Sequence, residues 1–260
     1  MRGRSAVRCW LEAPFFAIRF LTVVPPIVGR RPPEAGDFGR SDAFFPMVGL
    51  GLGGLLAAVD LLARPVLAEP VLNVLLVATL AALTGALHLD GVIDTFDGLL
   101  GGASREQRLA IMRDPRAGSY GVVAVVLLLG LKLAALSALP PAVRTPALLL
   151  APCLGRWGIV LVTQTFPYAR PEGMGRAFKE SIRVQHLLVA GATSLGAAAL
   201  LGGAAGSVVW LAVGAAVVVA GRGITAALGG LTGDSYGAIC EAAEAGVLVA
   251  FGLRLGSVLG

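Results

Sequence analysis

The stretch GSYGVVAVVLLLGLKLAALSAL, residues 118–139, contains one charged side chain, that of Lys132, in an otherwise apolar run. A helix needs about 20 predominantly apolar residues to cross the hydrocarbon core of a bilayer. Inside hydrocarbon every backbone N–H and C=O group must be paired within the protein, and a helix achieves this within one segment. The stretch therefore predicts a transmembrane helix.

Apolar runs of this kind recur through the whole chain. Its 260 residues are 56% hydrophobic and 14% charged, with a mean hydropathy of +0.82, whereas soluble domains have about 25% charged residues. The alternating pattern of a membrane β-barrel is not found. We predict an all-α, polytopic transmembrane helical bundle in one domain, residues 1–260. The expected spans, about seven in number, are 43–64, 71–89, 118–139, 146–165, 186–203, 205–228 and 236–256.

The N-terminal stretch LEAPFFAIRFLTVV, residues 11–24, is apolar but too short to span a bilayer comfortably. Arg19 also interrupts it. We interpret it as an interfacial helix lying on the membrane, and we expect Pro25 and Pro26 to end it because proline cannot continue a helix.

The charge distribution predicts how the chain is oriented. The net charge is +5 and the isoelectric point is about 9.6, but the basic residues lie in short segments between apolar runs, within 2–40, 105–116 and 170–183. The loops on the opposite side contain only Arg64 and Arg144. This bias follows the positive-inside rule and predicts a cytoplasmic N-terminus. The lipid bilayer is thus the expected partner, nucleic acid is excluded, and all polar loops are expected on one face.

The motif HLDGVIDTFDG, residues 88–98, contains the main candidate site. At about 100° per residue, Asp90, Asp94 and Asp97 fall within roughly 60° of one another on a helix. Three carboxylates on one stripe repel one another unless they are solvated, protonated or neutralised by a cation. Oxygen-rich sites suit hard divalent ions such as Mg²⁺. The alternative is a solvated helix end. His88 is a candidate for phosphate binding or base catalysis, or is merely hydrogen-bonded.

Two further segments contain candidate anion-binding side chains. In ASREQRLAIMRDPRAGSYG, residues 103–121, we expect an amphipathic surface helix. Arg113 and Arg116 follow it, just before a glycine turn, where they are candidates for recognising an anionic substrate. The loop FPYARPEGMGRAFKE, residues 166–180, contains Arg170 and flexible glycines, which suit a loop that covers a substrate and clamps phosphate. The alternative is a basic loop that only obeys topology.

The segment GGLTGDSYGAICEAAE, residues 229–244, adds the acids Asp234, Glu241 and Glu244. Glu241 and Glu244 are three residues apart and therefore share a helix face. Carboxylates inside a membrane are costly to bury and are functional by default. We expect them to belong to the same site as the aspartates. The alternative is a structural pairing with bases inside the apolar spans, which are Lys132, Arg156 and Arg222.

Together these residues offer acids for a metal ion and arginines for phosphate. No Ser-His or Cys-His nucleophile arrangement accompanies them. The set therefore favours phosphoryl transfer by positioning and charge neutralisation. The residues alone do not name a substrate.

Several strings resemble the cobalamin synthase family, also called adenosylcobinamide-GDP ribazoletransferase. The resemblance covers nearly the whole chain and is most specific where HLDGVIDTFDG precedes MRDPRAGSYG, residues 112–121. It implies an enzyme of the bacterial inner membrane, with its active site facing the cytoplasm. This enzyme would use Mg²⁺ to join adenosylcobinamide-GDP to α-ribazole, or its 5′-phosphate, and would release GMP. The other matching strings are FLTVVPP (20–26), FFPMVGLGLG (44–53), FPYARPEGMG (166–175) and LTGDSYGAICEAAE (231–244).

The resemblance also suggests roles for the candidate residues. The metal ligands would be Asp90, Asp94, Asp97, Glu241 and Glu244. The catalytic residues would be His88, Asp94, Asp97 and Glu241. The substrate-binding residues would be Arg113, Arg116, Arg170 and Asp234. A homo-oligomer is compatible with the sequence, which does not set the oligomeric state.

Two other classes of membrane protein share some of these features. A CDP-alcohol phosphotransferase also uses Asp-rich membrane helices, but Asp94 and Thr95 stand where the Ala-Arg of its D-G-x-x-A-R pattern belongs. A transporter could line a path with Lys132, Arg156 and Glu241. Transporters usually have repeated halves, and here no repeat is found and the acids cluster at one face.

Overall fold

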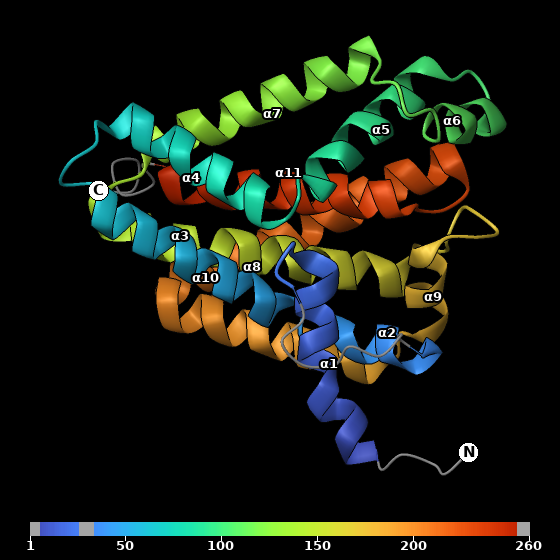
Figure 1. Ribbon diagram of the computed structural model, residues 1–260, viewed down its shortest axis with the longest axis horizontal. Coiled ribbons are helices and arrows are strands. Elements are labelled where there is room, and N and C mark those ends of the chain that lie inside the picture. The colour runs from blue at the N-terminus through green and yellow to red at the C-terminus, as the bar shows by residue number, and fades with distance from the viewer. Residues whose placement is uncertain (1–5, 26–33, 254–260) are drawn as a thin grey trace.

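The structure is a computed structural model that describes residues 6–25 and 34–253. In this part of the chain the only non-helical pairing is an isolated parallel bridge between Tyr168 and Leu231, so the expected all-α fold is confirmed (Figure 1). The helices are α1 (Ala6–Leu21), α2 (Ala35–Asp42), α3 (Phe45–Ala63), α4 (Glu69–Leu83), α5 (Leu87–Gly101), α6 (Arg105–Ile111), α7 (Ser119–Ala138), α8 (Pro141–Thr165), α9 (Met174–Ser181), α10 (Val184–Leu228) and α11 (Gly233–Gly252).

The long helices are those of a membrane protein. Among the described residues, α3, α7, α8 and α10 are long and apolar enough to cross a bilayer, and α4 with α5 adds a fifth crossing if that bent pair is one span. α8 lies at the centre, where α3, α10 and α11 pack against it. Its buried side chains include Leu150, Leu154 and Val160. The remaining helices surround this core.

α10 folds back on itself at Gly203. Its φ of 59° and ψ of −142° are not helical and suit glycine, which has no Cβ to clash. Trp210 Nε1 donates a hydrogen bond of 2.9 Å to Ser194 Oγ, 16 residues earlier, a separation of about 24 Å in a straight helix. The two arms are therefore antiparallel. The expected spans 186–203 and 205–228 correspond to these two helical arms.

The expected span 71–89 is not one continuous helix. α4 ends at Leu83, and the chain turns through Gly85 and Ala86, both with positive φ, before α5 begins at an angle of 89°. Two successive left-handed residues cannot continue a right-handed helix. The Thr84 hydroxyl donates to the carbonyl oxygen of Leu80 at 2.9 Å and so satisfies part of the exposed helix end. The aspartate stripe therefore lies on a separate helix, α5.

α1 corresponds to the expected interfacial helix but begins earlier, at Ala6, and ends at Leu21. It buries Ala13, Ala17 and Leu21 and packs on α2 and α3. Pro26, one of the two prolines expected to end it, lies outside the described residues.

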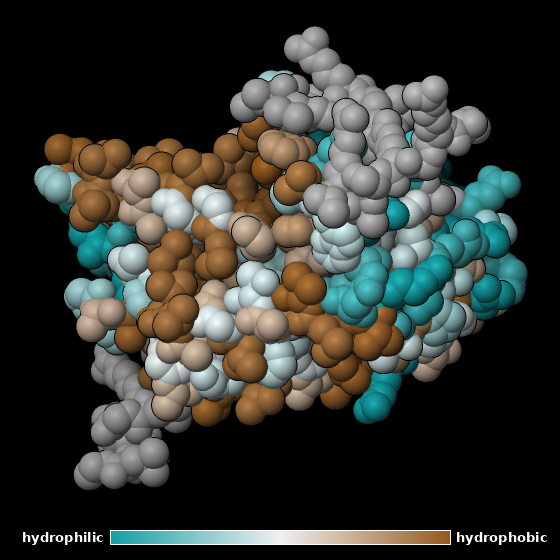
Figure 2. Space-filling view, turned by 90° about the horizontal axis from the view of Figure 1, so that it is seen from below, coloured by the Kyte–Doolittle hydropathy of each residue, from teal (hydrophilic) through white to brown (hydrophobic). Residues whose placement is uncertain are grey.

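The two ends of the bundle differ in polarity. Most hydrophilic residues lie at one end of the molecule and a smaller group lies at the opposite end, whereas the flank between them is mostly hydrophobic (Figure 2). The polar end is where α6, α9 and the start of α11 lie in Figure 1. At the other end Arg144 Nε contacts Asp60 Oδ1 at 2.9 Å, and Arg64 pairs with the same carboxylate. Arg144 also donates to Asn73 Oδ1 at 2.6 Å, and these contacts join α3, α4 and α8.

Candidate active site

α5 presents the acidic stripe to the start of α11. Gly91 makes this approach possible, because a Cβ at that position would lie 2.6 Å from the Asp234 carbonyl oxygen. The close packing brings Asp90 and Asp94 of α5 next to Asp234 of α11. The sequence placed Asp234 among the substrate-binding candidates, and the structure joins it to the aspartate stripe.

We call Asp90, Asp94 and Asp234 the acidic cluster. The carboxylate of Asp94 lies within electrostatic range of the other two and of the Arg170 guanidinium. Arg170 Nη2 contacts Asp234 Oδ2 at 2.8 Å. These three carboxylates outnumber the one arginine beside them, so the cluster carries unbalanced negative charge. This imbalance distinguishes the cluster from an ordinary ion pair.

The donor chemistry of the acidic cluster fits Mg²⁺. In the part of the chain that the structure describes, no group of three His, Cys, Asp or Glu side chains is arranged to hold a metal ion on its own. Mg²⁺ usually takes only one or two carboxylates from a protein and completes its shell with water and substrate phosphates. The cluster offers carboxylate oxygens of this kind together with unbalanced negative charge.

Hydrogen bonds join three loops at the polar end, next to Arg170. Ala169 N donates to Leu231 O, and Leu231 N donates to Pro167 O, both at 2.8 Å. Arg105 of α6 donates to the carbonyl oxygens of Leu228, at 2.7 Å, and Ala169, at 3.2 Å. These contacts confirm that the loops after α5, α8 and α10 share one face. We predicted a surface helix within residues 103–121. α6 is that helix, and its residue Arg105 links the loops through these hydrogen bonds.

A cavity of about 240 Å³ opens beside the acidic cluster. Burial raises the pKa of the Tyr168 phenol, so this side chain is a neutral hydrogen-bond donor at the cavity wall. Asp42 and Thr163 were not predicted from the sequence, because single polar residues beside apolar runs form no motif. The polar side chains that line the cavity are Asp42, His88, Asp90, Thr163, Tyr168, Arg170, Asp234 and Tyr236.

Asp97 has a different environment from the other aspartates on α5. Its side chain is buried, and its Oδ2 and Oδ1 accept hydrogen bonds from Gly118 N at 2.7 Å and Gly121 N at 2.8 Å. These are backbone groups at the start of α7, where an anion is favoured by the helix dipole. Asp97 therefore caps α7. Its expected roles as metal ligand and catalytic residue stay predictions.

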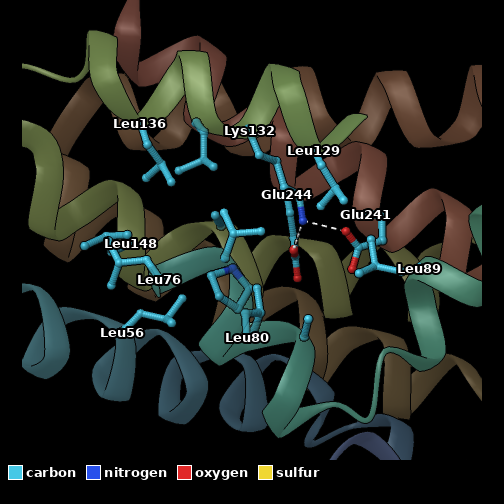
Figure 3. A pocket seen from close by; sticks show the side chains of 15 residues that line it. Leu56, Leu76, Leu80, Leu89, Leu129, Lys132, Leu136, Leu148, Glu241 and Glu244 are labelled. Atoms are coloured by element: carbon cyan, nitrogen blue, oxygen red, sulfur yellow. Dashed lines mark hydrogen bonds and ion pairs between the residues drawn. The ribbon is translucent and has the colours of Figure 1, made fainter. Parts of the chain in front are cut away.

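Glu241 and Glu244 are engaged in a buried network with bases of neighbouring helices. Lys132 Nζ of α7 contacts Glu241 Oε2 at 2.5 Å and Glu244 Oε2 at 2.6 Å, and Arg156 of α8 pairs with Glu244. Leucine side chains surround the lysine and the two glutamates (Figure 3). Two acids and two bases balance in charge, so the structural alternative is the arrangement present. Arg222, the third base considered, is exposed. Metal binding by the glutamates stays a prediction.

His88 lies between this network and the cavity. It is only 4% exposed and is one of the residues that line the cavity. Its Nδ1 atom is 3.4 Å from Nη2 of Arg156. His88 is therefore in contact both with the ion network and with the cavity where a substrate would bind.

The two arginines after α6 are placed differently from Arg170. Arg116 is exposed and pairs with Asp114 at 2.7 Å, and its hydrogen bonds lower the pKa of Asp114 to about 2. Arg113 is also exposed; it lies within electrostatic range of Tyr168. Of the three arginines expected to bind substrate, only Arg170 lines the cavity.

These features define an all-helical membrane protein with a carboxylate-lined cavity at its polar end. The chain belongs to the cobalamin-5-phosphate synthase family, whose model matches residues 13–252. No solved structure matches the chain.

Curated relatives extend over most of the chain. A protein named adenosylcobinamide-GDP ribazoletransferase from Roseiflexus sp. (strain RS-1) is 43% identical over 228 residues, covering 88% of this chain and 84% of the relative. Proteins of the same name from Stutzerimonas stutzeri (strain A1501) and Pseudomonas paraeruginosa are 41% and 42% identical. They cover 92% and 94% of this chain, and 97% and 98% of their own lengths. These matches do not favour the CDP-alcohol phosphotransferase or the transporter.

Proposed function

We propose that this protein is an adenosylcobinamide-GDP ribazoletransferase. It joins adenosylcobinamide-GDP to α-ribazole, or its 5′-phosphate, and releases GMP. The observation that carries the proposal is the acidic cluster with its excess negative charge, placed beside Arg170 at a cavity. The relatives of this name, which the chain matches over 84–98% of their lengths, support it.

The reaction is a phosphoryl transfer from an anhydride to a hydroxyl group. A hydroxyl oxygen of the ribazole forms a bond to the phosphorus nearer the cobinamide, and the proton of that hydroxyl group is lost to solvent. The bond from that phosphorus to the bridging oxygen breaks, and its electron pair leaves with GMP. Negative charge develops on the phosphate oxygens, and enzymes of this kind work mainly by positioning and neutralising it.

The residues at the cavity suit these tasks. Arg170 neutralises phosphate charge by a charge-assisted hydrogen bond, and the Tyr168 hydroxyl is a second donor on the same wall. His88, in contact with Arg156, is positioned to hydrogen-bond a substrate oxygen. Asp90, Asp94 and Asp234 would hold Mg²⁺, which supplies charge stabilisation for the departing phosphate.

We place the enzyme in the bacterial inner membrane with this cavity facing the cytoplasm. The basic residues at the polar end support that orientation through the positive-inside rule. Cysteines introduced at the exposed positions Ser104, Glu172 and Gly233 test it. A membrane-impermeant thiol reagent added to intact spheroplasts is expected to leave all three unlabelled, and labelling at any of them would contradict the orientation.

Release of GMP tests the proposed activity directly. Purified protein in detergent is incubated with adenosylcobinamide-GDP, α-ribazole and Mg²⁺, and nucleotide products are separated by chromatography. We expect GMP to appear in amounts equal to the cobalamin formed, and only when both substrates are present. A protein that is folded but forms no GMP under these conditions contradicts the proposal.

A further inference from the structure

Two cavities meet near the polar end of the bundle. The first is the cavity of about 240 Å³ beside the acidic cluster. The second has about 320 Å³ and lies among α1, α2 and α9, which are neighbours in Figure 1. Both cavities are lined by Phe20, Leu87, Met174 and Phe178. The shared wall shows that the two spaces adjoin, as a reaction between two substrates requires.

Two of the four residues in the shared wall, Phe20 and Phe178, are aromatic, and further rings adjoin them. The Phe20 and Phe178 rings lie 4.5 Å apart between centroids, and Phe38 meets Phe178 at 5.0 Å. Phe45, 5.9 Å from Phe20 and nearly parallel to it, extends the group. Aromatic rings favour further flat rings in stacked or edge-on arrangements. This wall therefore suits a flat aromatic group better than it suits a flexible or charged one.

Asp42 adds a polar group at the inner cavity. It is the last residue of α2, its side chain is 1% exposed, and it lines the cavity. Its Oδ2 atom is buried and has no hydrogen-bond partner. Native structures rarely leave a buried polar atom unpaired. Burial raises the pKa of Asp42 well above its usual value, because removal from water disfavours the charged form of the carboxyl group.

The chemistry of the two ends separates their ligands. The acidic cluster and Arg170 favour a phosphoanhydride with its cation. The aromatic residues between the cavities, with the buried carboxyl group of Asp42 on the inner side and Arg19 and Asp37 at the second cavity, favour a flat ring that carries hydroxyl groups. A nucleoside with a flat aromatic base combines these features, and in the proposed reaction the nucleoside is the acceptor substrate.

We propose that the aromatic wall of Phe20 and Phe178 binds the base of the acceptor nucleoside, and that Asp42 hydrogen-bonds to a hydroxyl group of its sugar. This subsite places the nucleoside between α1, α2 and α9, with its sugar toward the acidic cluster. The assignment of acceptor and donor rests on the proposed function. The binding of an aromatic nucleoside does not depend on turnover.

Binding of α-ribazole alone tests the subsite. Isothermal titration calorimetry in detergent is performed on the full-length wild-type protein and on Asp42→Leu. Leucine has a similar shape and removes the unpaired polar atom, so the variant is expected to fold, which a melting curve checks. We expect the dissociation constant for α-ribazole to rise about tenfold, the usual effect of losing a buried hydrogen bond. A rise of less than threefold overturns the role of Asp42.

The aromatic wall is tested with a matched pair of variants. Phe178→Leu is expected to weaken α-ribazole binding about tenfold. Phe251→Leu makes the same change near the end of α11, at a side chain that is similarly buried, 8% against 5% exposed, and it is expected to change binding less than twofold. Equal effects of the two substitutions would show a general loss of packing and would overturn the subsite.

Steady-state kinetics separates this inference from the proposed function. In the GMP-release assay, Asp42→Leu and Phe178→Leu are expected to raise the KM for α-ribazole and to leave the KM for adenosylcobinamide-GDP within about twofold. If the KM for adenosylcobinamide-GDP rises instead, the subsite belongs to the other substrate and the inference is wrong. If the wild type binds α-ribazole but forms no GMP, the proposed function fails while the binding subsite stands.

Discussion

Two groups of carboxylates lie within this bundle, and their partners give them opposite properties. Glu241 and Glu244 face Lys132 and Arg156, so acids and bases balance inside the core. In the described part of the chain, the acidic cluster of Asp90, Asp94 and Asp234 has one arginine beside it, Arg170, and so retains unbalanced charge at a cavity. The number of acidic side chains in a segment therefore does not show whether they form a structural ion network or a metal site. The number of basic side chains that contact them distinguishes the two.

Glu244→Gln is expected to have the largest effect on stability, because it leaves the fully buried Arg156 without its acid. Breaking a buried ion pair by removing one partner costs about 3–5 kcal/mol. We expect the free energy of unfolding to fall by this amount, with and without Mg²⁺, in a denaturation series of the purified protein.

Glu172→Gln is the control, because Glu172 is exposed and its loss should leave stability unchanged. If Glu244→Gln unfolds like the wild type but needs more Mg²⁺ for activity, Glu244 belongs to the metal site and the contrast between the two groups fails.

Asp94→Asn is expected to lower the rate of GMP release more than about a hundredfold, about 2.7 kcal/mol in activation free energy. The change removes one charge from the acidic cluster and so weakens cation binding. It also relieves repulsion between neighbouring carboxylates, so thermal stability should hold or rise. A variant that retains more than a tenth of the wild-type rate would count against Asp94 as a metal ligand.

Asp97→Asn separates a capping aspartate from the acidic cluster on the same helix. One carboxylate oxygen becomes an amide nitrogen, which cannot accept the hydrogen bond from Gly118 or Gly121. We expect the free energy of unfolding to fall by about 1–2 kcal/mol, measured beside Asp94→Asn. If Asp97→Asn instead keeps full stability and loses activity, the carboxylate serves the metal site.

Arg116→Ala is expected to have the smallest effect. Its guanidinium pairs with Asp114 on the surface, and exposed ion pairs of this kind contribute little to stability because solvent screens them. We expect both the KM for adenosylcobinamide-GDP and the melting temperature to stay near wild type. Arg170→Ala, which removes the arginine at the cavity, is the comparison and should raise that KM about tenfold. Equal effects would place both arginines in the site.

The sequence by itself determined the helices that the bilayer imposes. Long apolar runs must pair their backbone groups locally in hydrocarbon. Composition therefore predicts helices at segments such as 118–139 and in the two arms around Gly203. The basic loops and the aspartate stripe at 88–98 are equally local features. They predicted that the polar loops meet at one end and that this end holds the candidate site.

Only the tertiary structure decided which charges meet. Lys132 and Glu244 are 112 residues apart, and no spacing rule links them; they pair because α7 and α11 pack side by side. The turn at Gly85 and Ala86 was also not predicted from the sequence, because alanine rarely adopts a left-handed conformation. Asp42 gave no signal, since a lone carboxylate before an apolar run resembles any helix end. Its role depends on burial in a cavity between distant helices, which is a property of packing and not of local sequence.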